Sequence, residues 1–143
     1  MIFVVDSNIV FSALLNPSSV IGEILIDVSN KFQFCAPEMM KYELDKYEEK
    51  IKRYSKLSSS EISILKDTIY SSINFISEEL ISEETWKKAF ELTKQTDEKD
   101  TPFVALALEL NTKLWSGDKK LQAGMKYKNR QLIIQTKEVL RLK

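Results

Sequence analysis

The sequence predicts an α/β fold built around a parallel β-sheet, and three observations lead to this prediction. Residues 2–10 (IFVVDSNIV) are apolar except for three polar residues at 6–8. Such a run is typical of a strand buried on both faces. Short apolar stretches then alternate with helical patterns, as βαβ units require. Finally, 143 residues with 43% hydrophobic content and only three Gly and three Pro indicate one ordered domain over residues 1–143.

The first half of the chain begins with this strand, which we expect to end at Asp6. Pro17 fits the first position of a helix that has Asn16 as its N-cap. The elements expected next are a helix to about residue 29, a strand at Phe32–Cys35, a polar helix at 38–54, a helix capped within Ser58–Ser60, and a strand at Ile73–Ile76.

The second half continues the alternation. It contains a helix at 82–95 with Trp86, Ala89, Phe90 and Thr93 on its inner face, a charged turn at Asp97–Asp100, a hydrophobic helix at Phe103–Leu110 opened by Pro102, a strand at Lys113–Ser116, an irregular basic segment at 119–130, a strand at Gln131–Gln135, and a final helix capped by Thr136. Strands separated by helices in this way predict crossover connections and a parallel sheet.

The composition excludes several kinds of chemistry. There is no histidine, so nucleophile–histidine systems, histidine zinc sites and imidazole bases are all excluded. The single cysteine, Cys35, cannot form an internal disulfide, which suits a reducing, cytoplasmic location; we interpret it as a buried hydrophobe. No apolar run approaches the roughly 20 residues of a membrane span, and no signal peptide is expected.

The charge is unevenly distributed although the formal net charge is zero. From position 113 to the end, nine basic residues stand against Asp118 and Glu138, so this segment carries +7. Such asymmetry indicates an anionic partner, although lysines on a solvated surface explain it equally well. The candidates for nucleic-acid binding are Lys119, Lys120, Lys126, Lys128 and Arg130. Trp115 and Tyr127 are possible stacking groups, but Trp115 fits the core better, and for Tyr127 an ordinary surface role is equally open.

Four acidic residues stand out because of their positions. Asp6 ends the first strand, Asp118 follows a later strand through Ser-Gly, Asp100 precedes the hydrophobic helix, and Glu43 lies in the helix after the second strand. In a parallel sheet, ligands bind beyond the carboxyl ends of the strands, so all four can face one crevice.

Each acid also has a purely structural interpretation. Asp6 and Asp100 could cap helices, Asp118 could serve a turn, and Asp97 could be a supporting acid or part of a turn. Glu43 has acidic neighbours on the same predicted helix that could fill the same role, and most such charges simply form a solvated face. Taken together, however, carboxylates gathered in one crevice need a cation. A hard-oxygen site without histidine suits Mg²⁺ or Mn²⁺, and a metal-bound water can attack a phosphoryl centre.

Three segments together resemble the PIN-domain nucleases, and most closely the VapC-like toxin components of toxin–antitoxin pairs. They are the opening strand with Asp-Ser-Asn, the stretch DTPFVALAL from Asp100, and LWSGDKKL around Asp118. The resemblance implies a three-layer α/β/α sandwich whose acids bind Mg²⁺ or Mn²⁺ and cleave RNA. An antitoxin partner and a homodimer are also expected.

By position, the resemblance makes Asp6, Asp100 and Asp118 metal ligands, and Glu43 matches the remaining acid of the family best. It places Asn8 and Ser116 as supporting or water-holding groups. The alternative from another class is a non-catalytic PIN-like module that binds RNA or protein. A small phosphohydrolase is disfavoured because the chain lacks a glycine-rich phosphate loop.

Overall fold

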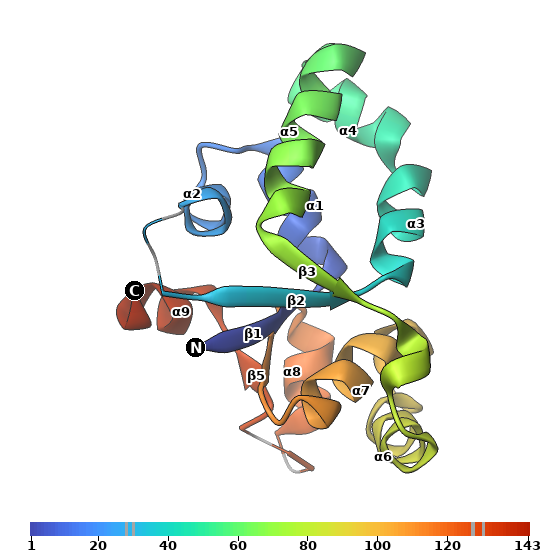
Figure 1. The fold of residues 1–143 in the computed structure, drawn as a ribbon. Coiled ribbons are helices and arrows are strands. Elements are labelled where there is room, and N and C mark those ends of the chain that lie inside the picture. The colour runs from blue at the N-terminus through green and yellow to red at the C-terminus, as the bar shows by residue number, and fades with distance from the viewer. Residues whose placement is uncertain (28, 30, 127, 130) are drawn as a thin grey trace.

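The computed structural model describes residues 1–27, 29, 31–126, 128–129 and 131–143. Its centre is a five-stranded sheet in which every paired neighbour is parallel (Figure 1). The strands are β1 (Ile2–Val5), β2 (Gln33–Pro37), β3 (Ile73–Ile76), β4 (Lys113–Trp115) and β5 (Ile133–Ile134), in the order β3-β2-β1-β4-β5. The predicted parallel α/β fold is therefore confirmed.

Helices cover both faces of this sheet, which confirms the three-layer α/β/α sandwich (Figure 1). On one face lie α1 (Ser7–Leu15), α2 (Val20–Ile26), α3 (Met39–Lys46), α4 (Glu48–Ser55) and α5 (Ser59–Ser71). The other face carries α6 (Glu83–Thr93), α7 (Thr101–Glu109) and α8 (Lys119–Met125). The remaining elements are two short 3₁₀ turns, η1 (Glu78–Leu80) and η2 (Glu98–Asp100), and the last helix, α9 (Thr136–Leu142).

The core lies between β1, β4 and the hydrophobic helix α7. Val4 and Val5 of β1 are fully buried, as a central strand covered on both faces requires. Helix α7 packs against β1, β2, β4 and α6, so five consecutive residues from Phe103 to Ala107 are buried. Trp115 is completely buried, as predicted, and its Nε1 donates a hydrogen bond to Thr136 Oγ1 at 3.0 Å. Cys35 is also buried, as expected.

Several helix boundaries differ from the sequence prediction. The last helix, α9, has Gln135 as its N-cap, in a capping box with Glu138, and is not capped by Thr136. Helix α2 is capped by Ser19, whose hydroxyl accepts from the Gly22 N–H at 3.2 Å, and not by Asn16. The segment predicted as one helix over 38–54 is two helices that meet at Tyr47. The Tyr47 N–H donates to Leu44 O at 3.1 Å, which is a tightened i→i+3 turn. Such a turn hardly changes the spacing of the apolar side chains, so the pattern does not reveal it.

Two further predictions were wrong. The segment expected to be irregular begins with α8, because Asp118 caps it and Leu121 and Met125 bury one face at a spacing of four residues. Phe90, predicted to lie on the inner face of α6, is 43% exposed.

In the described part of the chain no single helix could cross a membrane, although the bent pair α1 and α2 together meet the length and composition of a span.

Candidate active site

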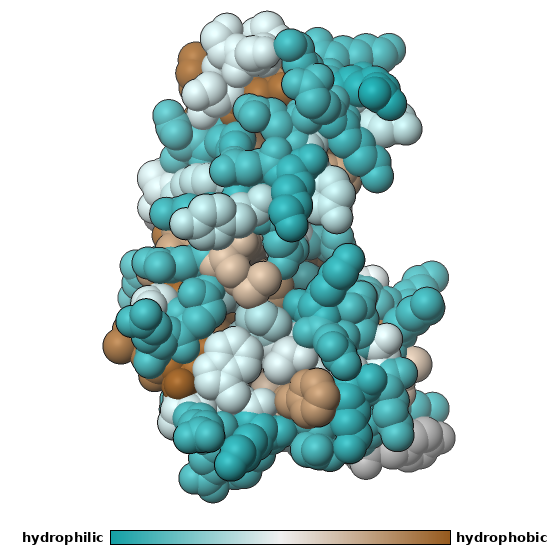
Figure 2. All heavy atoms as spheres, turned by 90° about the vertical axis from the view of Figure 1, so that its right-hand side faces the viewer, coloured by the Kyte–Doolittle hydropathy of each residue, from teal (hydrophilic) through white to brown (hydrophobic). Residues whose placement is uncertain are grey.

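The carboxyl ends of the strands form one edge of the sheet, and a cavity of about 280 Å³ opens there. Residues from both helical layers line this cavity. Figure 2 views this side of the molecule, which is largely hydrophilic and hollowed between the two helical masses. The sheet order changes direction between β1 and β4, so the chain leaves these strands towards opposite faces. A ligand crevice is expected at such a switch point.

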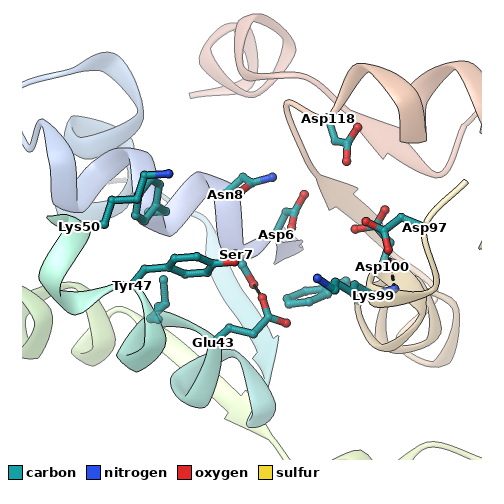
Figure 3. Close-up of a pocket in the computed structure, with 13 residues that line it drawn as sticks. Asp6, Ser7, Asn8, Glu43, Tyr47, Lys50, Asp97, Lys99, Asp100 and Asp118 are labelled. Atoms are coloured by element: carbon teal, nitrogen blue, oxygen red, sulfur yellow. Dashed lines mark hydrogen bonds between the residues drawn. The ribbon is translucent and has the colours of Figure 1, made fainter. Parts of the chain in front are cut away.

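Five carboxylates line this cavity, and they come from distant parts of the sequence. They are Asp6, Glu43, Asp97, Asp100 and Asp118. Figure 3 shows three aspartates on one side of the cavity, Glu43 on the other, and Asp6 between them. The structure thus brings together the four acids predicted as ligands and the predicted supporting acid. Their role as metal ligands stays a prediction.

Asp6 is held at the base of the cavity by the ends of two neighbouring strands. Its N–H donates to Trp115 O at 3.1 Å, and Ser116 Oγ donates to its Oδ2 at 2.7 Å. Burial raises the pKa of Asp6, since only 4% of the residue is exposed; the bond from Ser116 opposes this rise, and the charge of Asp118 adds to it. Ser116 also accepts the Asp118 N–H at 3.1 Å. The predicted supporting residue Ser116 therefore contacts two of the acids.

Asp100 is the most perturbed acid of the site. Burial, followed by the charges of Asp6 and Asp118 and then of Asp97 and Glu43, raises its pKa to about 7. It makes no capping bond to α7, although it precedes that helix, and its Oδ2 is buried without a hydrogen-bond partner among the described residues. The interpretation as a helix cap is therefore wrong for Asp100. A buried carboxylate oxygen without a partner is costly unless a cation or a proton satisfies it.

The carboxylates of Asp118 and Asp97 do have structural roles, and they line the cavity as well. Asp118 Oδ1 accepts from the N–H groups of Lys120 and Leu121 at 2.9 and 3.1 Å, which caps α8. Asp97 Oδ1 accepts from the Lys99 N–H at 2.9 Å. These bonds fix the orientation of each side chain. The structural and functional interpretations are compatible for both residues.

Glu43 is oriented by a residue that the sequence analysis did not single out. Ser7 Oγ donates to Glu43 Oε2 at 2.8 Å and thereby links α1 to α3 (Figure 3). Asn8, which was singled out, is exposed on α1 and also lines the cavity. The available signal was the pair of hydroxyl and amide side chains after Asp6, because the first turn of a helix that starts there must face the same edge.

The lysines at the cavity are not those predicted. Lys50 and Lys99 line it, whereas the described candidates Lys119, Lys120, Lys126 and Lys128 do not. Lys119 and Lys126 line a second cavity beside α8 and β5. Arg130 and Tyr127 lie outside the described residues. Nucleic-acid binding by the predicted basic segment therefore stays a prediction.

The donor set suits a hard divalent cation, since every charged donor is a carboxylate oxygen and one such oxygen has no other partner. Within the described residues, no three Asp, Glu or Cys side chains already form a group that could enclose an ion. This arrangement fits an ion such as Mg²⁺, which retains several waters and can reach some of the carboxylates through them.

Comparison with known proteins places the chain in a family. The profile of the PIN domain matches residues 4–139. Among solved structures, the chain is similar to one in the crystal structure of VapBC2 from Rickettsia felis bound to a DNA fragment from their promoter. That likeness has a TM-score of 0.67 at 13% identity, and covers 94% of this chain and 98% of the other. At this identity it shows the fold alone. No curated protein matches the sequence significantly.

Proposed function

The chain belongs to the PIN domain family of nucleases, which generally use divalent metal ions, and on that premise we propose that it is a Mg²⁺- or Mn²⁺-dependent endoribonuclease. The observation that carries the proposal is the convergence of five carboxylates on one cavity at the switch point of the sheet. Without a cation, their mutual repulsion opposes folding. This repulsion is most evident at Asp100. Its pKa is raised to about 7, and one of its buried oxygens has no partner among the described residues.

Asp6, Asp100 and Asp118 would hold the cation, and Glu43 would complete the set. When bound, the ion lowers the pKa of a coordinated water and offsets charge on the phosphoryl oxygens. Ser116 keeps Asp6 oriented towards the cavity and fixes the start of the turn that carries Asp118. Ser7 does the same for Glu43 from the opposite helical layer. Asn8, which is exposed and lines the cavity, would hold water or substrate.

RNA is the proposed substrate because it is implied by the resemblance to VapC-like proteins, and because the cavity mouth carries cationic and aromatic groups beside the acids. An RNase that attacks through the 2′-oxygen commonly relies on histidine, and this chain has none. Hydrolysis by a metal-activated water would instead need carboxylates to hold the ion, and these line the cavity.

We further propose that the protein is the toxin of a toxin–antitoxin pair and acts in the cytoplasm. Support comes from the structural likeness to a chain of the VapBC2 complex. An antitoxin would bind this chain and cover the acidic cavity, and a homodimer is expected as well. Inducible expression tests the toxin role: the wild-type protein is expected to arrest growth, and Asp6→Asn is expected not to. Equal growth of both strains would contradict it.

Cleavage of labelled single-stranded RNA tests the enzymatic proposal directly. Wild-type protein is expected to cut in Mn²⁺ or Mg²⁺ and to stop when EDTA is added. The Asp6→Asn variant should cleave at least a hundred times more slowly than wild type, because removing one preorganised charge from such a site raises the activation free energy by about 3 kcal/mol or more. Asp67→Asn is the matched control, since Asp67 is an exposed acid on α5 that does not line the cavity.

Equal cleavage by wild type and Asp6→Asn would end the nuclease assignment for these residues. RNA binding that is indifferent to metal, without any cleavage, would instead support the non-catalytic binding module. The two outcomes are distinguished in one experiment when binding and product formation are measured on the same samples.

A further inference from the structure

One wall of the acidic cavity is built from α3 and α4, and it carries an aromatic ring and an ammonium group. Glu43, Tyr47 and Lys50 are spaced by four and three residues, and all three line the cavity although the helix breaks between α3 and α4. Figure 3 shows these side chains on the same side of the cavity, facing Asp6 and the three other aspartates. The wall therefore continues outward from the acids along α4.

Phe11 of α1, which also lines the cavity, packs against this wall. The rings of Tyr47 and Phe11 meet edge to face, with centroids 5.7 Å apart at 65°, and Lys50 Nζ lies 5.7 Å from the centre of the Phe11 ring. Phe11 itself is only partly exposed, whereas Tyr47 is 45% exposed. The Tyr47 ring is thus held in place by a neighbour and still presents surface to solvent, which is what a stacking platform requires.

The cations at the cavity are available for an anionic ligand. Across the described part of the chain, neither Lys50 nor Lys99 forms a salt bridge, although carboxylates line the same cavity. Lys50 lies on one side and Lys99 on the other (Figure 3). A polyanion that approaches a cavity lined by five carboxylates is repelled unless cations at the mouth receive its phosphates.

We propose that Tyr47, Lys50 and Lys99 form the subsite that binds single-stranded RNA beside the acids. A base stacks on Tyr47, and the flanking phosphates contact the two lysines. This assignment rests on the proposed ribonuclease function and moves substrate binding from the basic segment after Asp118 to the wall formed by α4 and to η2. Stacking needs an unpaired base, so the subsite selects single strands over duplexes.

Binding without catalysis tests the subsite. A fluorescein-labelled, single-stranded oligoribonucleotide of about ten nucleotides is titrated in EDTA at several salt concentrations. Tyr47→Ala is expected to weaken binding by about 5-fold to 100-fold. Lys50→Gln is expected to lower the slope of log K against log salt by about 0.7, the value for one phosphate contact on a single strand. In Mn²⁺, both variants should raise KM more than they lower kcat.

The chain offers matched controls on the same helices. Tyr42, 72% exposed on α3, and Lys52, exposed on α4, do not line the cavity, so Tyr42→Ala and Lys52→Gln should bind as wild type does. Tyr47→Leu keeps apolar contact with Phe11 but removes the aromatic face, and Tyr47→Phe restores it. If Tyr47→Ala is poorly folded by circular dichroism, the difference between these two variants decides the matter.

The proposal is overturned if the Tyr47 and Lys50 variants bind the oligoribonucleotide as the controls do, or if wild type does not bind it at about 50 mM salt. It is also overturned if a poly-glutamate peptide binds through Lys50 and Lys99 while RNA does not, because the wall is then a protein-binding surface. If RNA binding depends on Tyr47 but wild type shows no metal-dependent cleavage, the proposed ribonuclease function is contradicted, and the proposed binding subsite is supported.

Discussion

Replacing Asp100 by Asn should stabilise the metal-free protein at neutral and alkaline pH. The pKa of this carboxyl rises from 3.8 to about 7 on folding, chiefly through burial and then through the charges around it. The folded protein therefore holds a proton that the unfolded chain releases, and the free energy of unfolding falls as pH rises through this interval. Above pH 7 the whole penalty is present. Asn keeps the shape of the side chain and removes the charge.

The magnitude follows from the size of the shift. A change from 3.8 to about 7 corresponds to about 4 kcal/mol at 1.36 kcal/mol per pKa unit, before solvent screening. Asp100 is only partly buried, so we halve this figure to about 2 kcal/mol. The stability of Asp100→Asn relative to wild type is thus expected to increase by about 2 kcal/mol between pH 4 and pH 8.

Urea unfolding followed by circular dichroism in EDTA measures this difference at each pH. Asp67→Asn, on the exposed surface of α5, serves as the control and should show no such trend. Adding Mn²⁺ at pH 8 should stabilise wild type more than Asp100→Asn, since a ligand that binds only the folded state adds its binding energy to stability. A difference between Asp100→Asn and wild type that is the same at every pH would refute the reasoning.

Three further substitutions have definite expectations. Ser116→Ala removes the hydrogen bond to Asp6, so the free energy of unfolding in urea should fall by about 1 kcal/mol. Loss of this bond should also raise the pKa of Asp6 further and move the acid limb of the pH–rate profile to higher pH, and an unmoved limb would contradict this. Tyr70→Phe removes a buried hydroxyl that has no described partner, so melting should show equal or higher stability, and a loss above about 1 kcal/mol would reveal an unrecognised bond. Gly22→Ala would place a Cβ against the backbone oxygen of Pro17, closer than van der Waals contact allows, so we expect a loss of about 2 kcal/mol or more in the free energy of unfolding. Wild-type stability of this variant in urea would show that the loop shifts to make room.

The sequence was sufficient to predict the sheet, because its signals are local. The run Ile2–Val5, the apolar helix from Phe103 to Ala107 and the buried Trp115 each follow from a short pattern of side chains. The three aspartates could be placed at one edge for the same reason, since each follows a strand or precedes a helix whose direction the parallel topology fixes.

Other features of the site could not be predicted, because they depend on contacts between segments far apart in sequence. Ser7 and Glu43 are 36 positions apart, and no pattern in either segment indicates their hydrogen bond. Tyr47 and Lys50 reach the cavity only through the path that the chain takes at the tightened turn between α3 and α4. The charge count drew attention to the C-terminal lysines and not to Lys50 and Lys99, because a count does not show which side chains line a cavity.

The topology explains why these carboxylates stand together although they repel one another. β1 and β4 are neighbours, yet the chain leaves them towards opposite helical layers, so the residues that follow each strand are left at one opening. Ser116 then links them, since it donates to Asp6 and accepts the Asp118 N–H. The packing of the core therefore enforces a charge arrangement that is unfavourable by itself. A cation that reduces the repulsion between these carboxylates would bind more tightly for that reason. The measurements on Asp100→Asn determine how much of the cation's binding free energy comes from removing this repulsion.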